Sequence, residues 1–211
     1  MPMNHKNFSL LAVFVGFAAL AGTPGRSPAQ VNPVLGTTTA GHYPYTASDV
    51  HFIAGMIGHH AQAITMAGWA PTHGAGSSVR ILCERIINAQ ADEIALMQRW
   101  LEVRHQPIPE PKAGPMRMTM NGVEMEMLMP GMLSDEEMKQ LEAARGTEFD
   151  RRFLRFMIQH HQGAITMVNE LFASQGAGQD EVIFKFASDV YADQGTEIDR
   201  MQKMLILLLG K

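Results

Sequence analysis

A histidine pair lies inside an apolar helical pattern, and the chain contains this segment twice. The first copy reads HFIAGMIGHHAQAITM over residues 51–66, and the second reads RFLRFMIQHHQGAITM over residues 152–167. Residues 49–67 align with residues 150–168 at ten identities in nineteen positions, without a gap. The fold must therefore accommodate two similar helices, each with two imidazoles at or beside its apolar face.

The repeat extends into a second helix after each copy. The matched pairs are Gln90/Gln194, Glu93/Glu197, Ile94/Ile198, Met97/Met201, Gln98/Gln202 and Leu101/Leu205. In the later helix, the stripe predicted to be buried is Phe184, Ala187, Tyr191, Gln194, Ile198, Met201, Leu205 and Leu208. Glycine or proline residues interrupt the pattern between the helices, which indicates an internal duplication of a helical hairpin.

The whole pattern predicts an all-α four-helix bundle made of two duplicated αα-hairpins. The hairpins span residues 47–104 and 134–211, and a long central crossover over residues 105–133 joins them. Ser134 and Glu137 have the spacing of a capping box, so a short lead-in helix should begin there. No segment alternates convincingly between apolar and polar residues, and no β-strand is predicted.

The first 29 residues have the features of a signal peptide. An uncharged run over residues 8–20 follows Lys6, and Ser27-Pro28-Ala29 is similar to a cleavage site. The run is too short to cross a bilayer core of ~30 Å, although an uncleaved anchor is the alternative. Residues 30–46 are predicted to be a flexible lead. We expect a periplasmic or secreted bacterial protein with no membrane span after cleavage.

Charge and cysteine content argue against a nucleic-acid-binding protein and against a protein stabilised by disulfides. The formal net charge is −4, and it becomes more negative once Lys6 and Arg26 leave with the signal peptide, which disfavours nucleic acid as a partner. Cys83 is the only cysteine, so no intrachain disulfide forms and helix packing must supply the stability. Cys83 itself falls on an apolar helical stripe and is predicted to be inert.

The repeated histidines predict a metal site where the two copies converge. The candidate ligands are His59, His60, Met56, Met66, His160, His161, Met157 and Met167. Di-iron sites in helical bundles use Glu-x-x-His, whereas both copies here have Met-x-x-His. Thioether and imidazole together suit Cu(I) and silver, and imidazole alone also serves Cu(II) and zinc.

Each of these residues also has a structural interpretation. Histidines near a core face are commonly hydrogen-bonded core residues, and methionine commonly fills gaps in a core. Gln90 and Gln194 are predicted to hold the free ring nitrogens of the histidines, with plain interhelical contacts as the alternative. Asp49 and Asp150 are expected to cap helices or form salt bridges rather than bind metal.

The crossover contains MRMTMNGVEMEMLMPGM, a segment rich in methionine. If residues 116–120 and 125–129 are extended, their alternation places several thioethers on one side. Two roles remain open at this point, a second and weaker copper site or a flexible apolar cover for the bundle.

At these residues the sequence resembles the family called domain of unknown function 305, whose hallmark is the repeated HH-x-x-A-I-x-M helix. The resemblance covers about residues 47–209 and is strongest in MPGMLSDEEMKQLEAARGTEFDRRFLRFMIQHHQGAITM. It implies a ferritin-like four-helix bundle exported in bacteria, with periplasmic copper binding and resistance in some members. It also implies that the four histidines and nearby methionines are ligands. Gly58 departs from Gln159 of the second copy, so the two half-sites are expected to differ.

We therefore predict a non-enzymatic, exported protein that binds copper for periplasmic sequestration or tolerance. The expected partner is the metal ion, and self-association into a homo-oligomer is left open. One alternative is a ferritin-like metalloenzyme, which the absence of Glu-x-x-His disfavours. The other is a structural or interaction module whose histidines are hydrogen-bonded inside the core.

Overall fold

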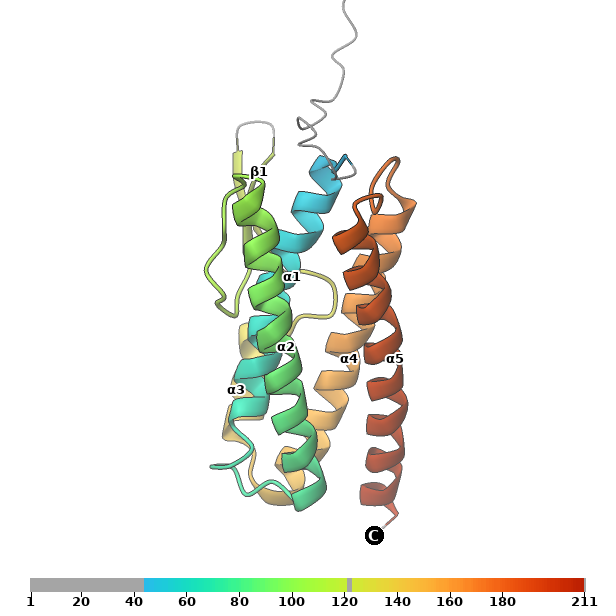
Figure 1. Ribbon diagram of the computed structural model, residues 1–211. Helices are drawn as coiled ribbons and strands as arrows, with labels where there is room; N and C mark the ends of the chain where they lie inside the picture. The colour runs from blue at the N-terminus through green and yellow to red at the C-terminus, as the bar shows by residue number, and fades with distance from the viewer. Residues whose placement is uncertain (1–43, 121–122, 211) are drawn as a thin grey trace, which may run out of the picture. The chain divides into compact units, whose positions relative to one another are not determined.

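The computed structural model describes residues 44–120 and 123–210, which fold into five helices and one two-stranded sheet (Figure 1). The elements are α1 (Ala47–Gly68), α2 (Ser77–Val103), β1 (Met116–Met120), β2 (Val123–Met127), α3 (Asp135–Ala143), α4 (Gly146–Ala173) and α5 (Glu181–Leu209). The predicted signal peptide and residues 30–43 of the predicted lead lie outside the described residues. In the described part, no helix is long and apolar enough to cross a membrane.

Side-chain caps fix where three of the helices begin. Thr46 and Asp49 form a capping box at α1, and Ser134 and Glu137 form the predicted one at α3. Asp180 caps α5 by accepting hydrogen bonds from the backbone of the first turn. Each cap satisfies backbone N–H groups that the first turn of a helix leaves without partners.

The two copies of the repeated segment lie on α1 and α4, which run antiparallel in contact with each other. The Asp49 carboxylate at the start of α1 accepts a hydrogen bond of 2.7 Å from the backbone N–H of Gly178, beyond the end of α4. Asp150, early in α4, accepts bonds of 3.1 and 3.2 Å from Gly76, beyond the end of α1. Each aspartate thus holds the loop of the other copy, which supports its structural interpretation.

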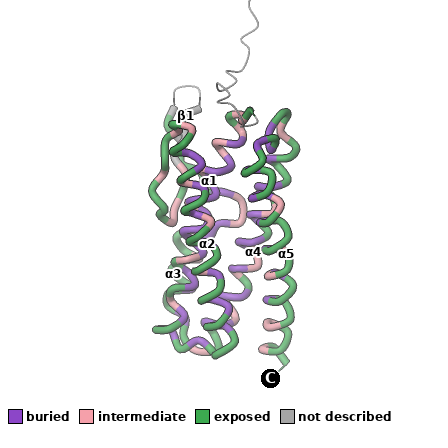
Figure 2. Tube along the Cα trace, in the orientation of Figure 1, coloured by how far each residue is buried: buried purple, intermediate pink, exposed green. Residues whose placement is uncertain are grey.

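α2 packs along α1, and α5 packs along α4. The buried residues of these four helices, drawn in purple in Figure 2, form two hydrophobic clusters, one toward each end. On α1 the two clusters meet at a boundary over residues 57–63, and on α4 they meet over residues 157–164. Gln90 of α2 and Gln194 of α5 lie at the same boundary and are buried. We call this boundary the polar layer.

The face of α5 differs from its prediction. Phe184 and Tyr191 of the predicted stripe are 58% and 50% exposed. The buried residues of α5 are Ile183, Phe186, Ala187, Val190, Gln194, Ile198 and Met201. A stripe drawn at a strict seven-residue period drifts by about 20° per repeat on a helix of 3.6 residues per turn. The prediction therefore holds at Ala187 and from Gln194 to Met201, with Leu205 and Leu208 partly buried, and it is wrong at Phe184 and Tyr191.

The crossover also corrects the prediction that the chain has no strand. β1 and β2 pair antiparallel, with Met116 opposite Met127 and Met118 opposite Met125 in the backbone register. The extended backbone that was considered for these residues is therefore present. Methionine alternates there with arginine, threonine and glutamate, but the segment has few of the β-branched and aromatic residues that favour strands, so the pattern does not predict a strand.

After the strands, the crossover enters the space between α1 and α4 (Figure 1). Gln62 of α1 donates to the Leu133 carbonyl at 2.9 Å and accepts from the Leu133 N–H at 2.7 Å. Met129, Met132 and Leu133 are buried there. This end of the crossover is therefore part of the core and not a cover over it.

The crossover passes so close to α4 that only glycine fits at residue 163. A Cβ atom added at Gly163 would lie 1.9 Å from the carbonyl oxygen of Pro130 and 2.5 Å from the Cα atom of Gly131. Both contacts are with backbone, so no side-chain rotation could relieve them. At Gly195 of α5, by contrast, an added Cβ meets no atom within 4 Å.

We predict that Gly163→Ala lowers the free energy of unfolding by about 2–4 kcal/mol, because the crossover must move away from α4. The matched substitution Gly195→Ala should raise it by up to about 1 kcal/mol, through helix propensity alone. Urea denaturation followed by circular dichroism measures both values. Equal effects of the two substitutions would contradict the close approach.

Candidate metal centre

The four histidines of the repeated segments meet in the polar layer, and all four side chains are fully buried. The rings of His59 and His160 are in contact across α1 and α4, with centroids 3.8 Å apart and planes inclined by 40°. His60 lies 6.3 Å from His59, and His161 lies 6.2 Å from His160, measured between ring centroids. The imidazoles of the two copies therefore converge, as the repeat predicted.

A glutamate from the neighbouring helix holds each outer histidine. His60 Nε2 is 2.7 Å from a carboxylate oxygen of Glu93 on α2, and His161 Nε2 is 2.7 Å from one of Glu197 on α5. Six side chains thus form a row across the helices. In order they are Glu93, His60, His59, His160, His161 and Glu197.

Gln90 and Gln194 do not hold the histidines, contrary to the prediction. Gln90 and Gln194 do lie in the polar layer, but their Oε1 atoms have no hydrogen-bond partner. The glutamates follow one helical turn later in each copy, and the repeat already matched Glu93 with Glu197. The matched glutamates could have indicated this role. A charged residue that both copies keep beside an apolar stripe is often paired with a neighbouring side chain.

The hydrogen bonds determine which ring nitrogens carry protons. Carboxylates and carbonyl groups only accept, so in a neutral imidazole the nitrogen facing one of them must be the N–H. His60 and His161 therefore donate from Nε2 to their glutamates, and His59 donates from Nε2 to the Pro130 carbonyl at 3.0 Å. In all three rings Nδ1 is buried without a hydrogen-bond partner.

His160 breaks the symmetry of the row. Both of its ring nitrogens are buried and have no hydrogen-bond partner. The crossover explains the difference, since its Pro130 carbonyl reaches His59 of the first copy only. The centre of the row therefore holds one imidazole fixed by the backbone and one imidazole with no fixed partner.

Burial keeps the central imidazoles neutral. Desolvation, followed by the nearby His60, lowers the pKa of His59 from 6.5 to about 3, although the Pro130 carbonyl acts in the opposite direction. Desolvation, followed by His59 and the other two histidines, lowers the pKa of His160 well below 6.5. At neutral pH both rings therefore have an available lone pair, which is the form that binds metal ions.

The predicted methionine ligands flank the row on both sides. Met56 and Met167 belong to one hydrophobic cluster, and Met66 and Met157 belong to the other, so each side has one thioether from each copy. Met56 lies within one helical turn of His59 along α1, and the end methyl of Met167 lies 3.4 Å from where a Cβ of Gly55 would be. All four side chains are buried.

In residues 44–120 and 123–210, the row of histidines and glutamates included, no group of three or more His, Cys, Asp or Glu side chains is arranged to hold a metal ion. Cys83 and the described histidines outside the row lie elsewhere in the fold. Burial, with a contribution from Asp150, raises the pKa of Cys83 to about 12, so it stays a thiol. His73 bonds the Glu142 carbonyl at 2.7 Å between α3 and the first hairpin loop. His42 falls outside the described residues.

Comparisons with known proteins show which family and which solved structures the chain is similar to. The family model described as a domain of unknown function (DUF305) matches residues 49–205. A solved DUF305 protein of Streptomyces coelicolor is 28% identical, with a TM-score of 0.63, covering 76% of this chain and 93% of that one. A DUF305 fragment of Deinococcus radiodurans is also 28% identical, with a TM-score of 0.63, covering 77% and 98%.

A third similar structure is that of CopM with Cu(II) bound. It is 27% identical, with a TM-score of 0.57, and the match covers 74% of this chain and 95% of CopM. CopM has also been solved with Cu(I) and with Ag bound, and those structures match at 28% identity and a TM-score of 0.54. Among curated proteins no significant match was found.

We predict that the metal-free protein loses stability as the pH falls below 6.5. The unfolded chain then binds protons at His59 that the folded chain, with a pKa of about 3, does not bind. Linkage gives a loss of about 2 kcal/mol by pH 5 from His59 alone, and His160 acts in the same direction. Urea denaturation between pH 7 and pH 5 measures this slope. A double variant, His59→Gln with His160→Gln, should show a shallower slope, and a flat profile in the parent protein would contradict the assignment.

Proposed function

Because the chain belongs to the family named domain of unknown function 305, we propose that it is an exported protein that binds copper ions at the row of histidines. In this proposal residues 1–29 are a signal peptide and residues 30–46 a lead. The mature protein is periplasmic or secreted and sequesters copper. The proposal includes a ferritin-like four-helix bundle made from two duplicated hairpins. The provisional description of the Streptomyces coelicolor relative as a secreted protein supports the location.

One observation carries the proposal. His59, His60 and His161 each donate Nε2–H to an oxygen and leave a buried Nδ1 atom without a partner. Histidines that bind metals in proteins typically donate their other ring N–H to a carboxylate or a backbone carbonyl in this way. An unpartnered polar atom in the core costs about 1–3 kcal/mol, and a bound metal ion would remove that cost.

The donor set favours a soft ion. Imidazole nitrogens lie at the centre, and buried thioethers lie on both sides of the row. Thioethers bind Cu(I) and Ag(I) in preference to hard divalent ions, while imidazoles alone also accommodate Cu(II) or zinc. CopM, a similar protein of the same fold, has been solved with Cu(I), Cu(II) and Ag bound.

A metalloenzyme is the second candidate, and the two glutamates are the observation in its favour. Glu93 and Glu197 bring carboxylates to the row, which the Met-x-x-His spacing alone did not predict. Both carboxylates are, however, hydrogen-bonded to imidazole nitrogens and orient those rings. We therefore propose a binding protein without catalytic activity, in which the glutamates position the ligands.

The test is a Cu(I) titration of untagged mature protein, without oxygen, against the chelator bathocuproine disulfonate. We expect the double variant His59→Ala with His160→Ala to lose at least about tenfold in affinity, because the central ligands are gone. His51→Ala is the matched control, since this partly buried histidine lies on the same helix outside the row. Circular dichroism establishes that both variants remain helical.

The same preparations distinguish the alternatives. Unchanged affinity and stoichiometry in the double variant would eliminate copper binding at the row. Purified protein that contains iron and consumes oxygen would favour the metalloenzyme. Copper that binds at the row should also raise the melting temperature of the parent protein and of His51→Ala, but not that of the double variant.

A further inference from the structure

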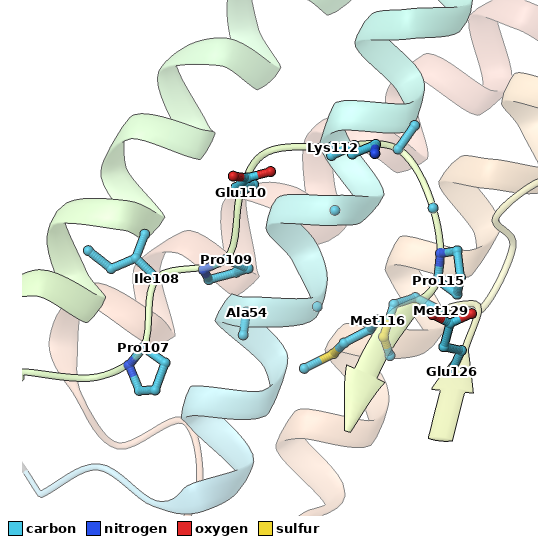
Figure 3. Close-up of a pocket in the computed structure, with 14 residues that line it drawn as sticks. Ala54, Pro107, Ile108, Pro109, Glu110, Lys112, Pro115, Met116, Glu126 and Met129 are labelled. Carbon is cyan, nitrogen blue, oxygen red and sulfur yellow. The ribbon is translucent and has the colours of Figure 1, made fainter. Parts of the chain in front are cut away.

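A cleft of about 600 Å³ opens between α1 and the crossover (Figure 3). Its floor is the part of α1 that carries Ala54, Gly55 and Gly58, and its wall is formed by residues 107–110 and 112–116 together with Glu126 and Met129. The space above this part of α1 is open because its residues have little or no side chain. A Cβ atom added at Gly58 would lie 3.7 Å from the Lys112 carbonyl oxygen and would begin to fill the cleft.

The floor of this cleft adjoins the row of histidines. Gly58 directly precedes His59 in the chain, and Gly55 lies about one helical turn before it. The histidines themselves have no exposed surface, so an ion from solvent needs a path between packed elements to reach them. The cleft brings solvent to within one turn of the row.

Two thioethers lie along that path. Met116, half-buried, and Met129, buried, both line the cleft, and Figure 3 shows them at the end of the cleft nearest the strands. The Met129 sulfur lies 2.9 Å from where a Cβ of Gly55 would be, so it rests directly on α1. The next residue, Pro130, accepts the hydrogen bond from His59. Met129 is therefore one residue along the chain from a direct contact with the row.

The lining of the cleft also includes charged side chains. Glu110 contributes a carboxylate and Lys112 an ammonium group, and Glu126, which also lines the cleft, already has an interaction partner. Carboxylates hold a soft monovalent ion weakly, so such an ion would pass from them to sulfur.

We propose that this cleft is the path by which a soft monovalent ion, Cu(I) or its redox-inert analogue Ag(I), reaches the histidines. Met116 binds the ion first, Met129 receives it at α1, and the imidazole row takes it from Met129. The transfer exchanges thioether ligands for imidazole ligands and involves no change of oxidation state. This inference rests on the proposed function and adds a transient binding site to it.

The second copy is built differently at the equivalent position. Its equivalent of Gly58 is Gln159, and the crossover lies against α4 there, with the Gln159 carbonyl 2.6 Å from where a Cβ of Gly131 would be. Gln159 also indicates the variant that would close the path. Gly58→Gln places in the first copy the residue that the second copy already has, and glutamine favours a helix more than glycine does.

The test measures the rate of Ag(I) and Cu(I) uptake by stopped flow, separately from the amount bound at equilibrium. We expect Gly58→Gln to slow uptake by about tenfold or more, with the final stoichiometry unchanged. Met116→Leu combined with Met129→Leu should slow it similarly, because leucine keeps the volume and removes the sulfur. The matched controls are Gly195→Gln on α5 and Met138→Leu on α3, neither of which lines the cleft.

Slower uptake in both cleft variants, with normal final occupancy and unaffected controls, supports the path. Uptake at the parental rate in both cleft variants overturns it. A loss of final occupancy in the methionine variant also overturns it, because those sulfurs would then belong to the equilibrium site. If the parent protein binds neither ion, the proposed function fails first, so the two failures are distinguishable.

Discussion

The arrangement of the described helices depends on burying four imidazoles in one layer. A buried imidazole avoids the cost of charge only by staying neutral, and a neutral imidazole has one N–H group that needs an acceptor. Glu93, Pro130 and Glu197 supply three acceptors from three different parts of the chain. Two glutamates on helices and one carbonyl in the crossover therefore determine how the rings are turned and which nitrogens remain available.

The rest of the fold holds the histidines of this layer in position. Hydrophobic clusters on both sides leave the histidines no apolar position to move into, because the cores are already filled by packed side chains. The crossover fixes the spacing of α1 and α4, since Gln62 pairs with Leu133 and the Pro130 carbonyl lies against Gly163. The Pro130 carbonyl of the crossover accepts a hydrogen bond from His59 and none from His160. The two central histidines of a nearly symmetrical row therefore differ chemically.

The repeat in the sequence predicted the helices, the capping box at Ser134 and the meeting of the four histidines. These follow from local periodicity and from the matched pairs, which are visible without coordinates. The partners of the histidines did not follow in the same way. Glu93 and Glu197 reach their rings from other helices, and the Pro130 carbonyl comes from a crossover whose path no local pattern specifies. The short β1–β2 ribbon and the rotation of early α5 were also missed, because both depend on packing between distant segments.

The exchange of contacts by Asp49 and Asp150 has a consequence for how such a chain could be divided. Each carboxylate reaches a loop of the opposite copy, and neither one holds the loop of its own hairpin. The same two bonds could form between separate molecules that each contained a single hairpin, related by a twofold axis. The covalent link between the halves then fixes their ratio and their order in the chain. It ensures that each molecule contains one of each half. It also allows the linking segment to contact the two halves differently, which a segment in two identical subunits could not do.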